Sequence, residues 1–183
     1  MIKIIVPLAN GFEEIEAIVP VDVWRRAGFE VLTVSITDKI LVTGAHNITL
    51  ATDTTLEKVD FSDASMIFLP GGMPGAKNLD ECDELNQILK SFNLEGKTIG
   101  AICAAPMVLG HNQILKGKNA TCFPGFEHEL YGANFTGNTV ETDQNIVTAK
   151  GAGVAMEFAL EIATRFKDKE FTQKLAAKMQ VPD

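Results

Sequence analysis

Short apolar runs alternate with amphipathic segments along most of this chain. The runs are rich in β-branched residues, and the segments between them carry apolar residues at helical spacing. This order predicts an α/β fold, with a mostly parallel sheet and helices on both of its faces. We expect strands at 3–9, 30–35, 66–69, 98–102, 120–122, 139–141 and 145–148, a hairpin formed by 41–43 and 48–51, and helices at 13–27, 79–92, from 106 onward, 156–166 and 171–179.

The length and composition predict one domain. A chain of 183 residues with 46% hydrophobic content can bury a sizeable core. No linker, repeat or low-complexity stretch marks a boundary, so we expect residues 1–183 to form a single domain. The apolar run at 4–9 is too short for a signal-peptide core or a membrane span, so no membrane association is expected.

Charge and cysteine usage narrow the functional classes. A formal net charge of −8 without a Lys/Arg run argues against nucleic-acid binding. The three cysteines, Cys82, Cys103 and Cys122, are too few for a disulfide framework and are not spaced like a zinc site, which favours a reducing cytoplasm. Carboxylates flank Cys82 and should keep it unreactive, and Cys122 is expected to serve only packing. We therefore expect neither a metal nor a cofactor.

Cys103 is the first candidate for chemistry. The strand at 98–102 runs directly into it, small residues follow, and Pro106 suits the first turn of a helix. This arrangement is typical of a nucleophile elbow, a sharp turn that bulky neighbours would obstruct. Backbone N–H dipoles at the helix start would favour the thiolate and lower the pKa of Cys103. The alternative is that Cys103 is a small buried hydrophobe, as free cysteines commonly are.

Glu16 is the second candidate. Apolar residues at Ile15, Val19 and Val23 form a stripe that should face the sheet, and Glu16 falls on it. A buried carboxyl should have a raised pKa and hold a proton that it can donate. For Glu14, also in the first turn, we favour simple complementation of the helix dipole.

Several segments together resemble the ThiJ/PfpI superfamily, and in particular its branch of the parkinsonism-associated protein deglycase. They are residues 11–17 (GFEEIEA), 21–28 (VDVWRRAG), 69–72 (LPGG), 101–106 (AICAAP), 150–153 (KGAG) and 157–160 (EFAL), in the family's order. The resemblance implies a flavodoxin-like sandwich with a fold like that of glutamine amidotransferases, and a homodimer. It also implies that Cys103 is the nucleophile or the oxidation site, that Glu16 lies beside it, and that backbone N–H groups of Gly72 and Ala104 form an oxyanion hole.

The chain departs from the family pattern in its histidines. Members with glyoxalase-type activity have a histidine before the proline of a Thr-x-His-Pro-like segment, where this chain has Phe123. Phe123 cannot shuttle protons, and His128, five residues later, is a candidate replacement. Peptidase-like members have a histidine directly after the cysteine, where this chain has Ala104, so a PfpI-type cysteine peptidase is disfavoured.

Two functions from different classes fit these residues. One is a cofactor-independent glyoxalase or deglycase, in which Cys103 attacks a 2-oxoaldehyde, free or as its adduct on a protein, and Glu16 moves a proton. The other is an oxidative-stress sensor or chaperone that acts through oxidation of Cys103. A glutamine amidotransferase would need a late His-Glu pair that the chain lacks. A binding protein with a vestigial site remains open.

Overall fold

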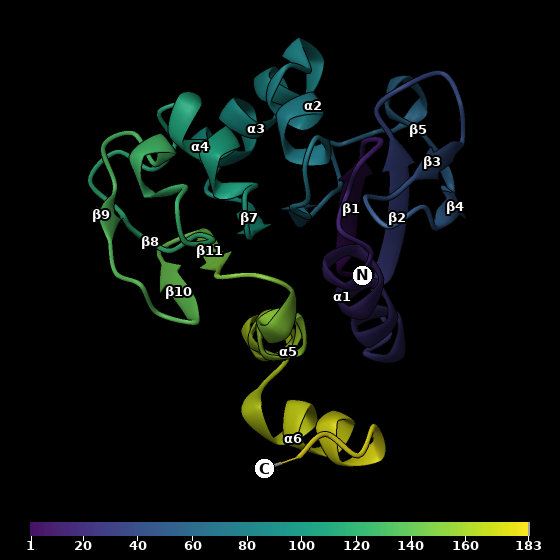
Figure 1. Cartoon of the computed structure of the whole chain (residues 1–183). Coiled ribbons are helices and arrows are strands. Elements are labelled where there is room, and N and C mark those ends of the chain that lie inside the picture. Colours follow the sequence, from purple (N-terminus) through teal and green to yellow (C-terminus); the bar gives the residue numbers. More distant parts are fainter. Residues whose placement is uncertain (183) are drawn as a thin grey trace.

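A seven-stranded sheet forms the centre of the computed structural model, which describes residues 1–182 (Figure 1). The strand order is β10-β11-β7-β6-β1-β2-β5, and all neighbouring strands are parallel except β10 and β11. The strands are β1 (Lys3–Leu8), β2 (Glu30–Ser35), β5 (Thr54–Thr55), β6 (Met66–Leu69), β7 (Thr98–Ile102), β10 (Val140–Asp143) and β11 (Ile146–Ala149). The expected α/β fold with a mostly parallel sheet is confirmed.

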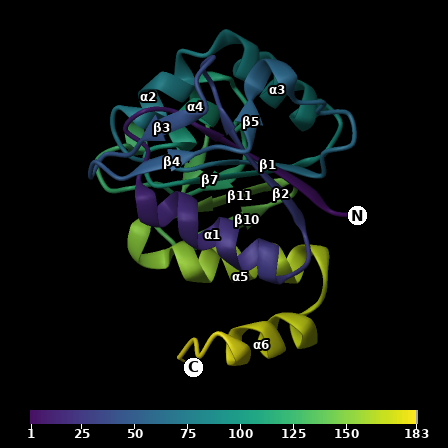
Figure 2. The ribbon, with the colours of Figure 1, turned by 90° about the vertical axis from the view of Figure 1, so that its right-hand side faces the viewer.

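Helices cover both faces of this sheet (Figure 2). They are α1 (Glu14–Arg26), α2 (Gly75–Asp80), α3 (Asp83–Leu94), α4 (Pro106–His111), α5 (Ala155–Phe166) and α6 (Lys169–Lys178), with short 3-10 turns η1 (Leu56–Lys58), η2 (Glu127–Glu129) and η3 (Ala152–Val154). Helices α2, α3 and α4 lie on one face and α1 and α5 on the other, with α6 packed outside α5.

Each central strand contributes to two hydrophobic cores. Ile5 and Ile67 pack under α2, α3 and α4, whereas their neighbours Ile4 and Met66 pack under α1 and α5. Because successive side chains of a strand point to opposite faces, burial on both faces requires a continuous apolar run. This is the pattern from which the strands were predicted.

Two small sheets lie outside the main one. Strands β3 (Leu41–Thr43) and β4 (Thr49–Ala51) form the expected hairpin, and β8 (Asn119–Ala120) pairs with β9 (Asn134–Phe135). The predicted strand at 120–122 is therefore shorter and displaced from the main sheet. The reason is that the N–H of Thr121 donates to the Thr148 hydroxyl and that of Phe123 to the carbonyl of Cys103.

Two helix predictions need correction. The single helix expected at 79–92 is two helices, because Cys82 has extended backbone and α3 begins afresh at Asp83 with an acidic first turn, which suits a helix start. Ile15 does not face the sheet but is exposed, since the buried face of α1 is formed by residues such as Glu16, Pro20 and Val23.

No helix within residues 1–182 is long and apolar enough to cross a membrane.

Candidate active site

The carboxyl ends of three neighbouring strands meet at the candidate site. Strand β1 leads into the loop before α1, β6 into the glycine turn at 70–75, and β7 into Cys103. After β1 the chain adds β2 and β5 on one side of β1, and it then returns to add β6, β7 and β11 on the other side. The strand order therefore reverses between β1 and β6. Crevices of this kind, at the carboxyl ends of parallel strands, are where α/β proteins bind ligands.

Cys103 has the backbone of a nucleophile elbow. Its φ is +64°, a left-handed conformation that side-chain-bearing residues rarely adopt and that marks functional strain. Two hydrogen bonds hold it: the Cys103 N–H donates to the Ala149 carbonyl at 2.9 Å, and the Phe123 N–H donates to the Cys103 carbonyl at 2.8 Å. The elbow is therefore fixed between β11 and the segment after β8.

Glu16 lies beside this cysteine, on the first turn of α1. Its side chain is buried, and Oε2 accepts a hydrogen bond from the Gly71 N–H at 2.9 Å. Oε1 is also buried, and the N–H of Ala152 favours its ionised form without reaching ordinary hydrogen-bond geometry. A buried carboxyl with so few donors is poised to hold a proton.

Two glycines permit this close approach. A Cβ on Gly71 would lie 2.6 Å from Glu16 Oε2 and 2.7 Å from Cys103 Cβ, so only glycine fits between the two side chains. Gly72 has φ +87°, and a Cβ there would overlap the backbone of Glu13. The N–H groups of Gly72 and Ala104 favour the ionised form of the Cys103 sulfur without reaching ordinary hydrogen-bond geometry.

The pKa values of both Glu16 and Cys103 are raised, and for the cysteine this is opposite to the direction expected from its position at a helix start. Burial raises the pKa of Glu16 to about 7, against the opposing effects of the Cys103 thiol and the Gly71 N–H. Burial and then the negative charge of Glu16 raise the pKa of Cys103 to about 12, against the opposing effects of the Gly72 and Ala104 N–H groups. The expected lowering of the thiol pKa is therefore wrong, because burial, the largest cause, raises it and the charge of Glu16 raises it further. Because the charge on one group disfavours charge on the other, the pair carries one readily exchanged proton.

The structure brings together four of the five predicted site residues, namely Cys103, Glu16, Gly72 and Ala104. It does not bring His128 to them: the histidine lies on η2, its side chain is 74% exposed, and its Nε2 is 3.1 Å from Glu129. Phe123 is closer to the site, through its hydrogen bond to the Cys103 carbonyl. No imidazole replaces the family's histidine among these contacts of the described residues.

Glu14, which we assigned only to the helix dipole, has a larger role. It is buried, and its Oε1 accepts hydrogen bonds from the N–H groups of His46 at 2.8 Å and Ile48 at 3.4 Å. Its Oε2 lies 2.9 Å from Nδ1 of His46. With Glu13, these side chains form a group that could hold a metal ion, since their ligand atoms lie within 4.8 Å of one another. The hydrogen bonds explain the group without an ion, because they tie α1 to the β3–β4 hairpin.

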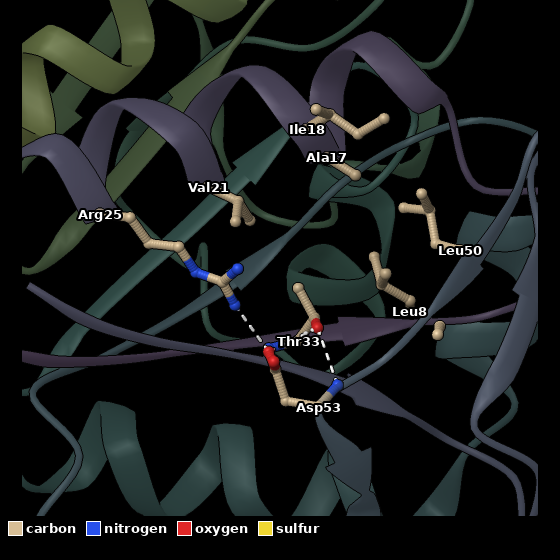
Figure 3. Close-up of a pocket in the computed structure, with 9 residues that line it drawn as sticks. Leu8, Ala17, Ile18, Val21, Arg25, Thr33, Leu50 and Asp53 are labelled. Carbon is tan, nitrogen blue, oxygen red and sulfur yellow. Dashed lines mark hydrogen bonds and ion pairs between the residues drawn. The ribbon is translucent and has the colours of Figure 1, made fainter.

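A pocket of about 190 Å³ lies away from Cys103, between α1, β2 and β4 (Figure 3). An ion pair crosses it, with an Arg25 nitrogen 2.7 Å from Asp53 Oδ2, and the same oxygen accepts from the Thr33 hydroxyl. The polar side chains that line this pocket, those of Arg25, Thr33 and Asp53, are bonded to one another, and no cysteine or histidine of the described residues lines it. The chemistry of the chain is therefore centred on Cys103.

The strained cysteine after a parallel strand, with a carboxyl beside it, places this chain among the α/β proteins that carry a nucleophile elbow. The profile of the DJ-1/PfpI family matches residues 2–165, and the chain belongs to that family.

Relatives and solved structures agree with this assignment. The chain is 37% identical to protein DJ-1 homolog B of Arabidopsis thaliana over 92% of its own length, although it spans only 39% of that longer protein. It is 34% identical to the glutathione-independent glyoxalase DJR-1.2 of Caenorhabditis elegans, over 89% of this chain and 87% of the relative. The structure of oxidized Toxoplasma gondii DJ-1 is 34% identical and superposes with a TM-score of 0.94, covering 98% of both chains.

Proposed function

We propose that this protein is a cysteine-dependent, cofactor-independent glyoxalase that converts 2-oxoaldehydes, free or as adducts on proteins, into hydroxy acids. The observation that carries the proposal is the pairing of Cys103 with the proton-holding carboxyl of Glu16, with two backbone N–H groups that favour the ionised sulfur. The similarity to a glutathione-independent glyoxalase also supports it.

The reaction needs no external oxidant. The sulfur of Cys103 adds to the aldehyde carbon, and the proton of the pair passes to the carbonyl oxygen, giving a hemithioacetal. In a protein adduct the sulfur displaces the protein's nitrogen or sulfur from the same carbon, and the proton of the pair passes to that leaving group. Glu16 then removes the hydrogen on the former aldehyde carbon as a proton and returns it to the neighbouring ketone carbon, while the hydroxyl proton of the hemithioacetal passes to the ketone oxygen. The product is a thioester of the hydroxy acid. Water cleaves the thioester and regenerates the thiol. One substrate carbon is oxidised and the other reduced, so the electrons balance within the substrate.

Each group has a defined task in this sequence. The N–H groups of Gly72 and Ala104 stabilise negative charge that develops at the sulfur or on the attacked oxygen. Glu16, with a pKa of about 7, can both accept and donate a proton near neutral pH. Its burial keeps that proton in the site.

The test is hydroxy-acid formation from methylglyoxal by the purified protein, without glutathione or added metal. We expect turnover by the wild type, and a loss of at least about 100-fold in kcat/KM for both Cys103→Ser and Glu16→Gln. Cys122→Ser is the control and should retain activity, since Cys122 is buried as packing. Full activity of Cys103→Ser would refute the proposal.

A second candidate function is redox sensing, or a chaperone controlled by redox state. It is favoured because no histidine of the described residues accompanies Cys103 and Glu16. Oxidation of the thiolate to a sulfinate needs none, and a sulfinate would accept hydrogen bonds from protonated Glu16 and from the Gly72 and Ala104 N–H groups. After mild peroxide treatment, we expect peptide masses to show two added oxygens on Cys103 alone. Glu16→Ala should abolish this selectivity, and oxidation spread equally over all three cysteines of the wild type would count against sensing.

We also propose that the protein acts as a homodimer in the cytoplasm. Large apolar side chains, among them Ile15 and Ile18 of α1 and Ile48 beside β4, are exposed close to one another in the fold. Exposed apolar side chains on neighbouring elements suit association with a second copy. The three cysteines are free thiols, which supports a reducing compartment.

A further inference from the structure

An open apolar pocket adjoins the Cys103–Glu16 pair. It has a volume of about 380 Å³ and is lined by Phe123, Pro124 and residues 150–154. Lys150 is its only charged lining residue, and the Lys150 ammonium group donates to the Gly137 carbonyl at 3.3 Å. A pocket of this size can receive the substituent of a small molecule.

Phe123 connects this pocket to the nucleophile. Its N–H donates to the carbonyl of Cys103 at 2.8 Å, so the backbone of Phe123 is fixed next to that of the reactive residue. A Cβ built on Gly151 would lie 3.2 Å from Cδ2 of Phe123 and 3.9 Å from Oε1 of Glu16. Because residue 151 is glycine, a narrow space stays open between the Phe123 ring and the Glu16 carboxyl. A larger residue at position 151 would fill this space with its side chain.

The ring of Phe123 is exposed to solvent beside the reactive pair. Phe123 is 47% exposed and Phe135 is 45% exposed, whereas the other nine phenylalanines are buried in the two cores or partly buried against them. An exposed aromatic ring beside a reactive pair offers apolar surface and no hydrogen-bonding group, so it favours a substrate that can cover it with apolar atoms.

From this juxtaposition we propose that Phe123 determines specificity, and that it selects 2-oxoaldehydes with a large apolar substituent, aryl or branched alkyl, on the ketone carbon. The proposal rests on the proposed glyoxalase function. The substituent packs on the Phe123 ring while the aldehyde carbon meets the sulfur of Cys103. Glyoxal, which has only hydrogen at that position, gains nothing from the ring.

The first experiment compares kcat/KM for phenylglyoxal and for glyoxal. We expect the wild type to prefer phenylglyoxal, and Phe123→Ala to reduce the ratio about tenfold, mainly through a higher KM for phenylglyoxal. Phe123→Leu, which keeps an apolar side chain, should restore most of the preference. The matched control is Phe135→Ala, because Phe135 is a similarly exposed phenylalanine, at 45%, that does not line the pocket.

The second experiment does not need turnover. The rates at which iodoacetanilide and iodoacetamide alkylate Cys103 are measured from the mass of the Cys103 peptide, and the anilide preference of the wild type should fall in Phe123→Ala and not in Phe135→Ala.

The outcomes separate the two claims. Wild-type protein that converts no 2-oxoaldehyde overturns the proposed function and the substrate class with it. Turnover with the same phenylglyoxal-to-glyoxal ratio in the wild type and Phe123→Ala overturns the role of Phe123 alone, as does an unchanged alkylation preference.

Discussion

Glu16 and Cys103 are both negative when ionised, so each disfavours ionisation of the other. They lie on either side of Gly71, where any larger residue would overlap them. Burial favours the neutral form of each group, and the charge of Glu16 raises the pKa of the thiol further. A reactive sulfur therefore arises when the carboxyl holds the proton, because the repulsion is then absent and the N–H groups of Gly72 and Ala104 still stabilise the thiolate.

This coupling predicts the behaviour of Glu16→Gln. Removing the negative charge should lower the pKa of Cys103 from about 12, and the midpoint of its alkylation rate against pH should fall by about one pH unit or more. Turnover should nevertheless be lost, because glutamine cannot move a proton. The range from pH 6 to pH 11 lies below the wild-type midpoint, so in iodoacetamide alkylation of the Cys103 peptide a lowered pKa appears as faster alkylation of Glu16→Gln than of the wild type at each pH. An equal or slower rate in the variant would contradict the coupling.

Gly71→Ala tests the spacing between the two side chains. The added methyl would lie 2.6 Å from Glu16 Oε2 and must displace either the carboxyl or the cysteine. Since displacements of about 1 Å can cost about 100-fold in rate, we expect kcat to fall by roughly that factor. Circular dichroism and the melting temperature are measured on the same samples. Unaltered kcat in a folded variant would show that the spacing is not critical.

At this scale, the sequence identified the chemistry but not its electrostatics. Cys103 could be found from the strand and turn around it, and Glu16 from its helical spacing of three and seven residues to Val19 and Val23. The direction of the thiol pKa depends on burial and on a charge that reaches it from another element. Glu14 was assigned too small a role for the same reason, since its partners lie more than thirty residues away.

Helix α1 and the β3–β4 hairpin are joined through the buried carboxylate of Glu14. Glu14→Gln replaces an oxygen that accepts hydrogen bonds with an amide group and leaves backbone donors of His46 or Ile48 less well satisfied. We expect the free energy of unfolding to fall by about 1–3 kcal/mol. Urea denaturation measures this, with Glu57→Gln on η1 as an exposed control that should change little. Equal destabilisation by both substitutions would contradict the assigned role.

His111 joins α4 to α2 and η2 through two carboxylates. Its Nδ1 lies 2.8 Å from Asp80 and its Nε2 2.9 Å from Glu129, and Tyr131 stacks on its ring. Burial alone would lower the pKa of His111, but the bonds to Glu129 and Asp80 outweigh it and raise the pKa. Glu129 is also paired with His128.

The sign of the resulting pH dependence follows from this direction. Because the folded-state pKa of His111 lies above the unfolded value of about 6.5, its contribution to stability is complete below that value. The contribution is lost as pH rises through the folded-state pKa. We expect the difference in unfolding free energy between the wild type and His111→Gln to shrink between pH 6 and pH 9, as measured by urea denaturation at each pH. A difference that grows with pH would show that the neutral histidine is the stabilising form.

The elements that the sequence located best are those buried on both faces. Strands β6 and β7 were predicted with the bounds that the structure has, because their continuous apolar runs end abruptly at a glycine turn and at Cys103. The two-residue strands β5 and β9 were missed, since their pairing depends on neighbours distant in sequence. The break between α2 and α3 was missed because amphipathic spacing continues across it.

For the whole molecule, strand order determines which side chains meet. Sheet order places the ends of β1, β6 and β7 side by side, so residues 16, 71, 72 and 103 converge although nearly ninety positions separate the first from the last. The sequence predicted the strands individually, and the resemblance to a family supplied the order in which they meet. The same order leaves the outer surfaces of α1 and of the β3–β4 hairpin next to each other.

That surface provides the test of the proposed dimer. Ile18 lies on the exposed side of α1 and lines the pocket near the hairpin (Figure 3). If two copies associate there, Ile18→Glu places a charge in an apolar contact. The substitution should therefore convert the dimer of 19.8 kDa chains into a monomer. Light scattering after size exclusion measures the mass. Leu94→Glu is the control, because Leu94 is at least as exposed but lies at the end of α3, on the opposite face of the sheet. A dimer that survives Ile18→Glu, or dissociates with Leu94→Glu instead, would place the interface elsewhere.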